Sequence, residues 1–325
     1  MRFFAGLILS LLLPVVAIAQ SLPRSSDGDV ANMALLMAAE AGRADLVAFA
    51  LDNGADIESR DQRPRRSTPL LLAAAGGHHG VARLLLARGA DANAVSSDGY
   101  TALIESADAR DDALMGVELI GAGANINAVA ADGTTALMAA AGRGHENFVS
   151  FLLLNKAAIH AVDNKGRDAL LLAAEDGSLE SVDALLMAGA NPNKRAGNGE
   201  TSLARAAVGA HAGVAARLLA AGTDVNTPGA NGQTPLIIAV RTGNVTVVDV
   251  LLGAGADVNR VELGNGNSAL MYAANSGFAD LVDILLARGA DVGTTASDGW
   301  TALEAAEMVG ETAIVERLRA AARGG

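Results

Sequence analysis

The sequence predicts an all-α solenoid of about nine helix–turn–helix units, a prediction that rests on two periodic patterns and one feature of composition. A leucine recurs at intervals of 33 to 35 residues, at Leu35, Leu70, Leu103, Leu137, Leu170, Leu203, Leu236, Leu270 and Leu303. A glycine recurs in step with it, at Gly54, Gly89, Gly123, Gly189, Gly222, Gly255 and Gly289. Half of the chain (51%) is hydrophobic but only nine residues are aromatic, which favours closely packed helices of Ala, Leu and Val. No single unit could cover its own apolar face, so we expect stability to come from stacking.

Each unit is expected to contain two short helices between turns. Asp or Asn precedes Gly in turns such as SSDG (96–99), and glycine readily takes the positive φ angle that a tight turn needs. Threonines then stand where a helix N-cap is wanted, at Thr68, Thr101, Thr135, Thr201, Thr234 and Thr301. Pro69 and Pro235 follow at the first helical position, which tolerates proline. The second helix carries paired leucines, as in VARLLLARGA (81–90), and the recurring glycine after it fits a left-handed C-cap.

The first nineteen residues have the pattern of a secretory signal peptide. Arg2 precedes an apolar stretch (3–16), and Ala17-Ile18-Ala19 supplies the small residues of a cleavage site. We predict a signal peptide over 1–19 that is cleaved after Ala19, a flexible leader over 20–32, and a periplasmic or secreted mature protein without a membrane span. A retained anchor is the alternative, although this apolar run is shorter than the ~20 residues that a span needs. The chain contains no cysteine, which suits an oxidising compartment.

Two segments closely resemble the ankyrin repeat: NGQTPLIIAVRTGNVTVVDVLLGAGADVN (231–259) and TPLLLAAAGGHHGVARLLLARGADANA (68–94). The resemblance implies helix–turn–helix units joined by β-hairpin-like loops. It also implies an activity, the binding of other macromolecules, usually proteins, through the loop tips and the first helices. We place the ankyrin repeat domain at 33–321 and a tail at 322–325. Its units are expected near 33–59, 60–94, 95–128, 129–161, 162–194, 195–227, 228–260, 261–294 and 295–321.

Several positions depart from the family pattern. Apolar residues such as Leu71 and Ile237 replace the histidine that follows T-P-L in the family. Lys156 stands where the C-cap glycine is expected, and Asp168 replaces the N-cap threonine, which is an acceptable cap. The segment 106–116 is one residue longer than its equivalents and lacks the glycine between the helices, so that loop is expected to differ.

The sequence carries no convergent catalytic or metal-binding pattern. His78, His145 and His211 share one repeat position and lie two repeats apart, too far to converge on one zinc ion, so we interpret them as structural; only His79 lies outside the repeat pattern. The D-x-N elements, such as Asp91 to Asn93, lack the other ligands of a calcium loop. There is no G-x-S-x-G elbow, P-loop or H-E-x-x-H motif. We therefore expect no enzyme activity, no cofactor and no metal.

Two features stand above the repeat background as candidate partner-binding residues. The loop RDQRPRR (60–66) contains Arg63, Arg65 and Arg66 and is either a solubilising tip or a contact for an anion or acidic partner. The second is the residue just before each N-cap, which varies from unit to unit and is Ser67 or Thr134 in two of the units. The expected contacts among these residues, named here the tip row, are Tyr100, Arg167, Glu200, Gln233, Asn267 and Trp300. Aromatic residues and arginine dominate interface hot spots, whereas packing against the neighbouring hairpin is the alternative.

These observations favour a non-enzymatic protein–protein interaction module. We expect an exported monomeric scaffold that binds a protein partner on its concave face and hairpin tips. The alternative is an inhibitor or accessory factor that regulates a periplasmic or envelope enzyme. Nucleic acid is not an expected partner, because the formal charge of −12 repels phosphate backbones.

Overall fold

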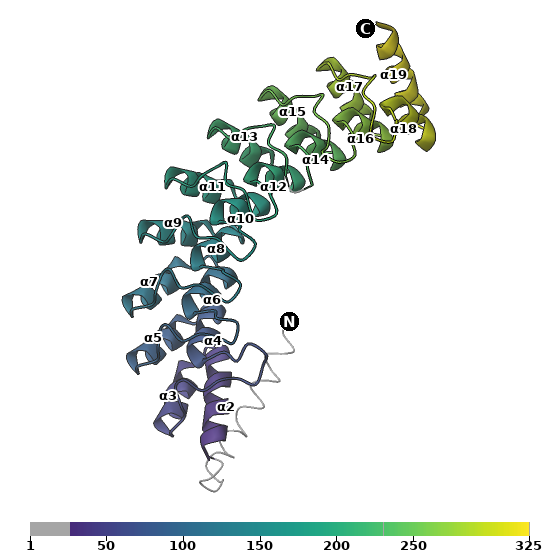
Figure 1. Cartoon of the computed structure of the whole chain (residues 1–325). Coiled ribbons are helices and arrows are strands. Elements are labelled where there is room, and N and C mark those ends of the chain that lie inside the picture. The colour runs from purple at the N-terminus through teal and green to yellow at the C-terminus, as the bar shows by residue number, and fades with distance from the viewer. Residues whose placement is uncertain (1–26, 230, 325) are drawn as a thin grey trace. The chain divides into compact units, whose positions relative to one another are not determined.

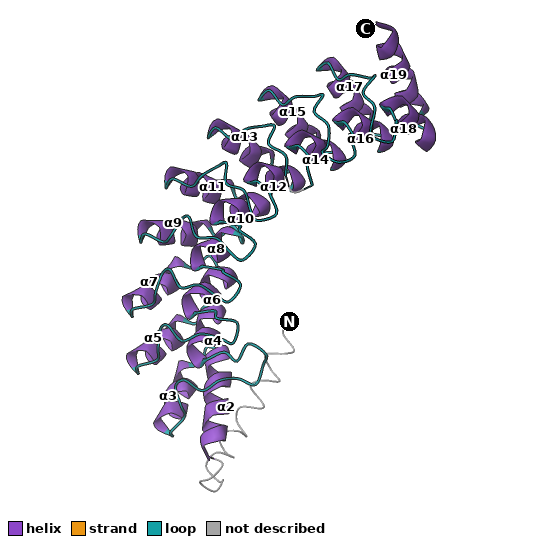
Figure 2. Cartoon of the chain, in the orientation of Figure 1, coloured by secondary structure: helices purple, strands orange, loops and turns teal. Residues whose placement is uncertain are grey.

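A computed structural model describes residues 27–229 and 231–324 of the chain, and these residues form eighteen α-helices without any strand (Figures 1 and 2). The helices that begin the repeats are α2 (Asp27–Glu40), α4 (Pro69–Gly76), α6 (Ala102–Ala109), α8 (Ala136–Ala141), α10 (Ala169–Asp176), α12 (Ser202–Val208), α14 (Pro235–Arg241), α16 (Ala269–Asn275) and α18 (Ala302–Val309). The helices that follow them are α3 (Ala44–Asp52), α5 (His79–Ala87), α7 (Ala113–Gly121), α9 (Glu146–Leu154), α11 (Leu179–Met187), α13 (Ala212–Ala220), α15 (Val245–Gly253), α17 (Ala279–Ala287) and α19 (Thr312–Gly324). The all-α repeat architecture predicted from the sequence is confirmed.

The described helices divide into two compact units, one up to Ala140 together with Asn147–Ala158, and the other from Ile159 onward together with Ala141–Glu146. In the first unit the first helices α2, α4 and α6 pack in sequence, as do the second helices α3, α5 and α7. In the second unit α10, α12, α14, α16 and α18 form one row, and α11, α13 and α15 form another (Figure 1). Within each unit, therefore, equivalent side chains of successive first helices share one face.

Side-chain caps fix where the first helices begin. Thr68, Thr101, Thr201 and Thr234 have extended backbones, and each hydroxyl accepts a hydrogen bond from the amide three residues on. Asp168 acts in the same way, since its carboxylate accepts from the Leu171 amide at 2.9 Å. The predicted caps are confirmed, and each contributes about 1 kcal/mol to helix stability.

Residues with positive φ end the helices and turn the chain. Gly77 caps α4 with φ of +68°, and Gly89 follows α5 with φ of +91°. Lys156 has φ of +65° where the other repeats use glycine, so this one turn is made by a residue that pays a steric penalty for it. At Gly166, φ is +75° and an added Cβ would lie 2.6 Å from the Gly197 nitrogen, so both conformation and space require glycine there.

The recurring leucines form the centre of the core. Eight of the nine, from Leu35 to Leu270, are at most 1% exposed. Burying each contributes about 1.5–3 kcal/mol relative to leaving it in water. Leu303 in α18 is only half-buried, because it lies in the final repeat and no further repeat covers it. The core is thus continuous along each row of stacked helices and thins at the last repeat.

Asparagine and histidine side chains join successive repeats. The Asn93 Oδ1 accepts from the Asn125 amide at 2.7 Å, and the Asn226 Oδ1 accepts from the Asp257 amide at 2.9 Å. His78 Nε2 lies 2.9 Å from the Glu40 carbonyl oxygen, and the His211 Nε2 makes the equivalent contact with Glu175. The structural interpretation of the D-x-N elements and of these two histidines is confirmed.

Both ends of the repeat array differ from the predicted boundaries. Helix α2 begins at Asp27, so residues 27–32 are helical rather than a flexible leader, and Asn32 Oδ1 accepts from the Asp56 amide at 2.6 Å. Helix α19 continues to Gly324 through most of the predicted tail. The predicted signal peptide over 1–19 lies outside the described residues. Between Asp27 and Gly324 no helix combines the length and apolar character required to cross a bilayer.

Candidate functional site

Backbone hydrogen bonds hold the hairpin tips of successive repeats against one another. In the first unit the Ser97 amide donates to the Arg65 carbonyl at 2.7 Å. In the second, the Gly197 amide donates to Lys165 at 2.8 Å, and the Ser297 amide donates to Asn265 at 2.8 Å. Isolated antiparallel bridges, such as Arg195 with Thr201, close individual tips in the β-hairpin-like manner that was predicted. The tips and the first helices therefore present side chains from a fixed backbone, on what we name the first-helix face of each unit.

The arginine loop of the first unit is largely neutralised by the chain itself. Arg63 forms ion pairs with Glu40 at 2.8 Å and with Asp61 at 2.5 Å. Arg65 pairs with Glu105 at 2.9 Å and with Asp98 at 3.0 Å. Most of the charge predicted to meet an anion is therefore already paired.

The other two arginines of this loop, Arg60 and Arg66, form no ion pair with a carboxylate among the described residues. Arg60 donates to the carbonyl oxygens of Arg66 and Val95, at 3.0 and 2.6 Å. Arg66 is exposed with φ of +50°, and its guanidinium bonds to none of the described residues. Of the three arginines of this loop that were predicted to bind a partner, Arg66 alone offers an unpaired guanidinium within the described chain.

Arg65 and Tyr100, which were both predicted to bind a partner, contact each other. The Arg65 guanidinium lies over the Tyr100 ring, 4.7 Å from the centroid. Burial raises the pKa of Tyr100 and also that of Glu105, where the attraction of Arg65 only partly opposes it. For Arg65 itself burial lowers the pKa, but Glu105 and Asp98 outweigh it, and the net shift is upward. Arg65, Tyr100, Asp98 and Glu105 therefore form a packed structural cluster, in which the Arg65 side chain is half-exposed.

In the second unit a chain of ion pairs begins at Arg167. Its Nε donates to Asp163 at 2.7 Å, and its Nη1 lies 3.9 Å from Glu175. Arg205 of α12 contacts the same Glu175 and also Glu200, at 3.4 Å. Arg167 and Glu200 of the tip row thus have partners within the chain, and neither carries an unpaired charge.

Gln233 is placed differently from its prediction as a surface contact. It is only 7% exposed, and its Nε2 donates to Glu262 at 2.9 Å. Glu262 also accepts from the Tyr272 hydroxyl and, at 3.0 Å, from Asn265. Asn267, the next tip residue, lies 3.4 Å from the Tyr272 hydroxyl. A buried carboxylate with several donors therefore holds this part of the face together.

The Tyr272 ring supports a cation that sequence reasoning missed. The Arg241 guanidinium of α14 lies 5.3 Å from the ring centroid. Arg241 is exposed, and within the described residues its side chain has no hydrogen bond or ion pair. Arg205, Arg241 and Tyr272 all point from the fourth or seventh residue of a first helix, counted from its start. Counting from the N-caps places all three on the first-helix face, although it does not reveal which of them meet.

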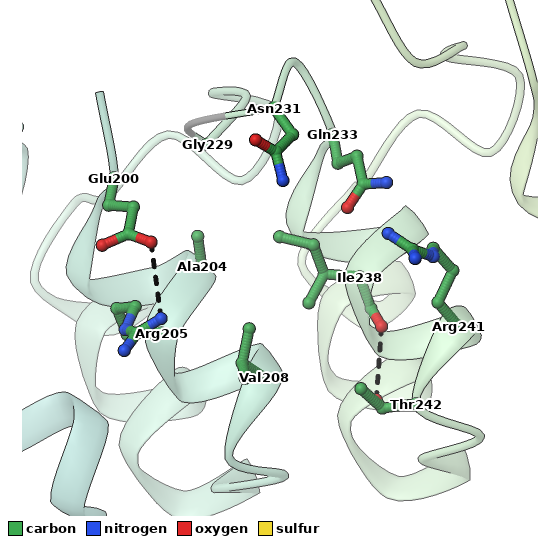
Figure 3. A pocket seen from close by; sticks show the side chains of 10 residues that line it. All are labelled: Glu200, Ala204, Arg205, Val208, Gly229, Asn231, Gln233, Ile238, Arg241 and Thr242. Atoms are coloured by element: carbon green, nitrogen blue, oxygen red, sulfur yellow. Dashed lines mark hydrogen bonds and ion pairs between the residues drawn. The ribbon is translucent and has the colours of Figure 1, made fainter. Parts of the chain in front are cut away.

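An open pocket of about 340 Å³ lies between α12 and α14 (Figure 3). Glu200, Arg205 and Val208 come from one repeat, and Gln233, Ile238 and Arg241 come from the next. The remaining lining residues are Ala204, Gly229, Asn231 and Thr242. Polar groups and an apolar surface therefore meet in one cleft.

Trp300, the last residue of the tip row, is 40% exposed. Met308 and Val309 of α18, in the same repeat, are exposed as well. The Trp300 amide donates to the Asp298 carboxylate at 3.2 Å. This bond fixes the Trp300 backbone and leaves its indole ring free for contact. Among the described residues, no three His, Cys, Asp or Glu side chains form a group that could hold a metal ion.

His79, which the repeat pattern left unexplained, joins two second helices of the first unit. Its ring nitrogens lie 3.0 Å from Glu118 and 2.7 Å from Asp112. Partial burial lowers its pKa, but the two carboxylates outweigh this and raise the pKa above its usual value. The loop at 110–112, between α6 and α7, places Asp112 for this contact, so His79 and this irregular loop belong to one structural feature.

A family model described as ankyrin repeats (3 copies) matches residues 35–116, 109–196, 189–262 and 257–323. The chain belongs to the ankyrin repeat family. Ankyrin repeats are protein–protein interaction modules, and the fold is generally non-catalytic. The family assignment made from the T-P-L and G-A-D-V-N elements is confirmed.

Two curated proteins share part of this repeat array. Human "Ankyrin repeat and KH domain-containing protein 1" is 46% identical over 79 residues, which is 24% of this chain and 3% of that protein. Drosophila melanogaster "Ankyrin repeat and KH domain-containing protein mask" is 43% identical over 79 residues, which is 24% of this chain and 2% of that protein. The chain spans only a few per cent of these relatives, so the similarity concerns the repeats alone.

Proposed function

We propose that this protein is an exported, non-enzymatic ankyrin scaffold that binds a protein partner on the first-helix face and hairpin tips. The observation that carries the proposal is the contrast between positions. The core leucine recurs in every repeat and the N-caps are confined to Thr, Ser or Asp, whereas the residues that reach this face change in charge, size and polarity. A face built on a fixed scaffold with varied side chains is suited to recognising one particular surface.

The first-helix face offers separate anchors for such a partner. Trp300, with Met308 and Val309, supplies an exposed apolar contact in the second unit. Arg241 supplies a cation supported by an aromatic ring, and Arg66 supplies one on the loop of the first unit. Buried aromatic and arginine anchors contribute most of the free energy in typical interfaces.

Affinity capture with the purified protein, followed by mass spectrometry of what is retained from an envelope fraction, tests the binding proposal. A partner retained by the wild type should be lost when Trp300→Ala and Arg241→Ala are combined. Asp249→Ala, on the second helix α15, is the matched surface control and should retain the partner. Retention by all three proteins alike would contradict binding through this face. Changed activity of a captured enzyme on mixing would make the protein a regulator of that enzyme.

Export is proposed from the pattern of residues 1–19 and has its own test. Cell fractionation should place the protein in the periplasm or the medium, and amino-terminal sequencing should begin at Gln20. A cytoplasmic protein that keeps Met1 or Arg2 would contradict export. The binding proposal would stand in that case, because it does not depend on the leader.

A further inference from the structure

Arg241 is set apart from Arg167 and Arg205, two other arginines of the first-helix face, by its lack of a carboxylate. Arg167 and Arg205 each contact at least one acidic side chain in the second unit. Arg241 contacts only the face of Tyr272, which fixes its orientation and leaves its N–H donors unbonded among the described residues. A guanidinium presents these donors as a rigid fork that matches a carboxylate.

The pocket beside Arg241 has the remaining features of a recognition site. Ile238, Ala204 and Val208 give it an apolar surface, and Asn231 contributes an amide that can donate or accept (Figure 3). Glu200 is the sole acid among the lining residues, and Arg205, which also pairs with Glu175, lies 3.4 Å from it. Glu262, which accepts from the Tyr272 hydroxyl, also accepts from Gln233 and Asn265. Among the lining residues, Arg241 is therefore the one charged group without a hydrogen bond or ion pair.

From this geometry we propose that the pocket binds an acidic side chain of the protein partner, an Asp or Glu flanked by an aliphatic residue. The carboxylate pairs with the Arg241 fork, and the aliphatic neighbour packs on Ile238 and Val208. The proposal rests on the proposed protein-binding function and names the chemistry of its contact in the second unit. An open cleft of about 340 Å³ suits a peptide segment better than an enclosed small molecule, whose sites bury most of the ligand.

The net charge of −12 does not prevent this contact. At physiological salt the Debye length is about 8 Å, so acids elsewhere on the surface are largely screened. The local charge decides the binding, and in the pocket it is the charge of Arg241. A long-range attraction is not expected, and specificity has to come from the short contact itself.

A peptide library tests the proposal directly. Random heptapeptides displayed on phage are selected on the purified wild-type protein, and the enriched peptides are then synthesised with a fluorescent label for anisotropy titration. We expect Asp or Glu to be enriched at one position, next to Leu, Ile or Val. Replacing that acid with its amide should weaken binding about tenfold or more.

Variants then assign the contact to Arg241. Arg241→Gln should weaken the acidic peptide about tenfold and bind the acid and amide peptides equally. Arg241→Lys keeps the charge but loses the fork and should fall in between. Arg260→Gln removes an exposed arginine outside the pocket and should leave the discrimination intact. Circular dichroism melting checks that each variant is folded.

Three results would overturn the proposal: no peptide is enriched, the enriched peptides lack an acid, or Arg241→Gln still discriminates acid from amide. In the third case the peptides bind without depending on Arg241. The pocket proposal then fails, while the proposed binding function stays in place. Loss of partner capture in the combined Trp300 and Arg241 variant tests that broader function separately.

Discussion

The two units each place an arginine over a tyrosine ring, but the two pairs differ in what else surrounds the cation. Arg65 lies 4.7 Å from the centroid of Tyr100 and is also paired with Glu105 and Asp98. Arg241 lies 5.3 Å from the centroid of Tyr272 and has no carboxylate among the described residues. The first arrangement stabilises the fold, whereas the second leaves a charge available for a partner.

This difference shows that residue type alone does not identify a contact residue. Both arginines are partly exposed beside an aromatic ring, the combination that is typical of interface hot spots. The neighbouring carboxylates determine whether the guanidinium is already used. An unpaired arginine is therefore a better indicator of a binding site than a cluster of arginines such as residues 60–66.

The largest expected contrast is in stability. Arg65→Gln should lower the free energy of unfolding by about 1–3 kcal/mol, because it leaves the nearly buried Glu105 without its cation. Arg241→Gln should change it by less than about 0.5 kcal/mol, as expected for a surface substitution. Urea unfolding followed by circular dichroism measures both, and the midpoints are compared because a long repeat array need not unfold in one step. Equal losses of stability in the two variants would contradict the claim that Arg65 stabilises the fold and Arg241 does not.

A smaller effect is expected from His79, another internally paired cation of the first unit. The His79 ring contacts Asp112 and Glu118. Arg83 also lies nearby, 3.6 Å from Glu118. Because its pKa is raised in the folded protein, its stabilisation is complete below about pH 6.5 and is lost as the pH rises through the raised folded-state pKa. His79→Gln should therefore destabilise by on the order of 1 kcal/mol at pH 5.5 and by less at pH 8.5.

Urea midpoints of the wild type and His79→Gln at the two pH values measure this difference. Asp112→Asn should reduce the pH dependence without abolishing it, because Glu118 remains beside the ring. A destabilisation by His79→Gln that grows with pH would show that the imidazolium is not the favoured form.

The smallest expected effect concerns the Tyr272 hydroxyl. Tyr272→Phe keeps the ring under Arg241 but removes the hydroxyl, which donates to Glu262 and accepts from Asn265 and Asn267. Glu262 retains Gln233 and Asn265 as donors. Binding of the acidic peptide should change less than twofold. A large loss would mean that the hydroxyl network, rather than the ring, positions Arg241.

The repeat framework was predictable from sequence because its signals are local. Thr234 caps a helix that starts at Pro235, and Gly166 makes a turn within four residues, so each can be identified without its partners. The start of α2 at Asp27 was not predicted, because residues 25–28 (SSDG) repeat the turn sequence of 96–99, whereas Asp27 and Gly28 belong to the helix.

The pairing of side chains on the first-helix face was much less predictable. Arg65 and Glu105 are 40 positions apart and meet only because successive repeats stack. Gln233 was expected at the surface, but the next hairpin places Glu262 against it and buries it. Arg241 and Tyr272 come from different helices, and neither carries a signal that reveals the other. Which charges remain unpaired is thus a property of the packed array.

The most direct test of this account compares the two arginines in one binding assay. The acidic peptide selected on the wild type is titrated against Arg65→Gln and Arg241→Gln by fluorescence anisotropy, at a temperature where both are folded. We predict that Arg241→Gln weakens binding about tenfold, whereas Arg65→Gln changes it less than twofold despite its larger effect on stability. Equal weakening by both, or a loss with Arg65→Gln alone, would contradict the claim that the unpaired arginine forms the contact.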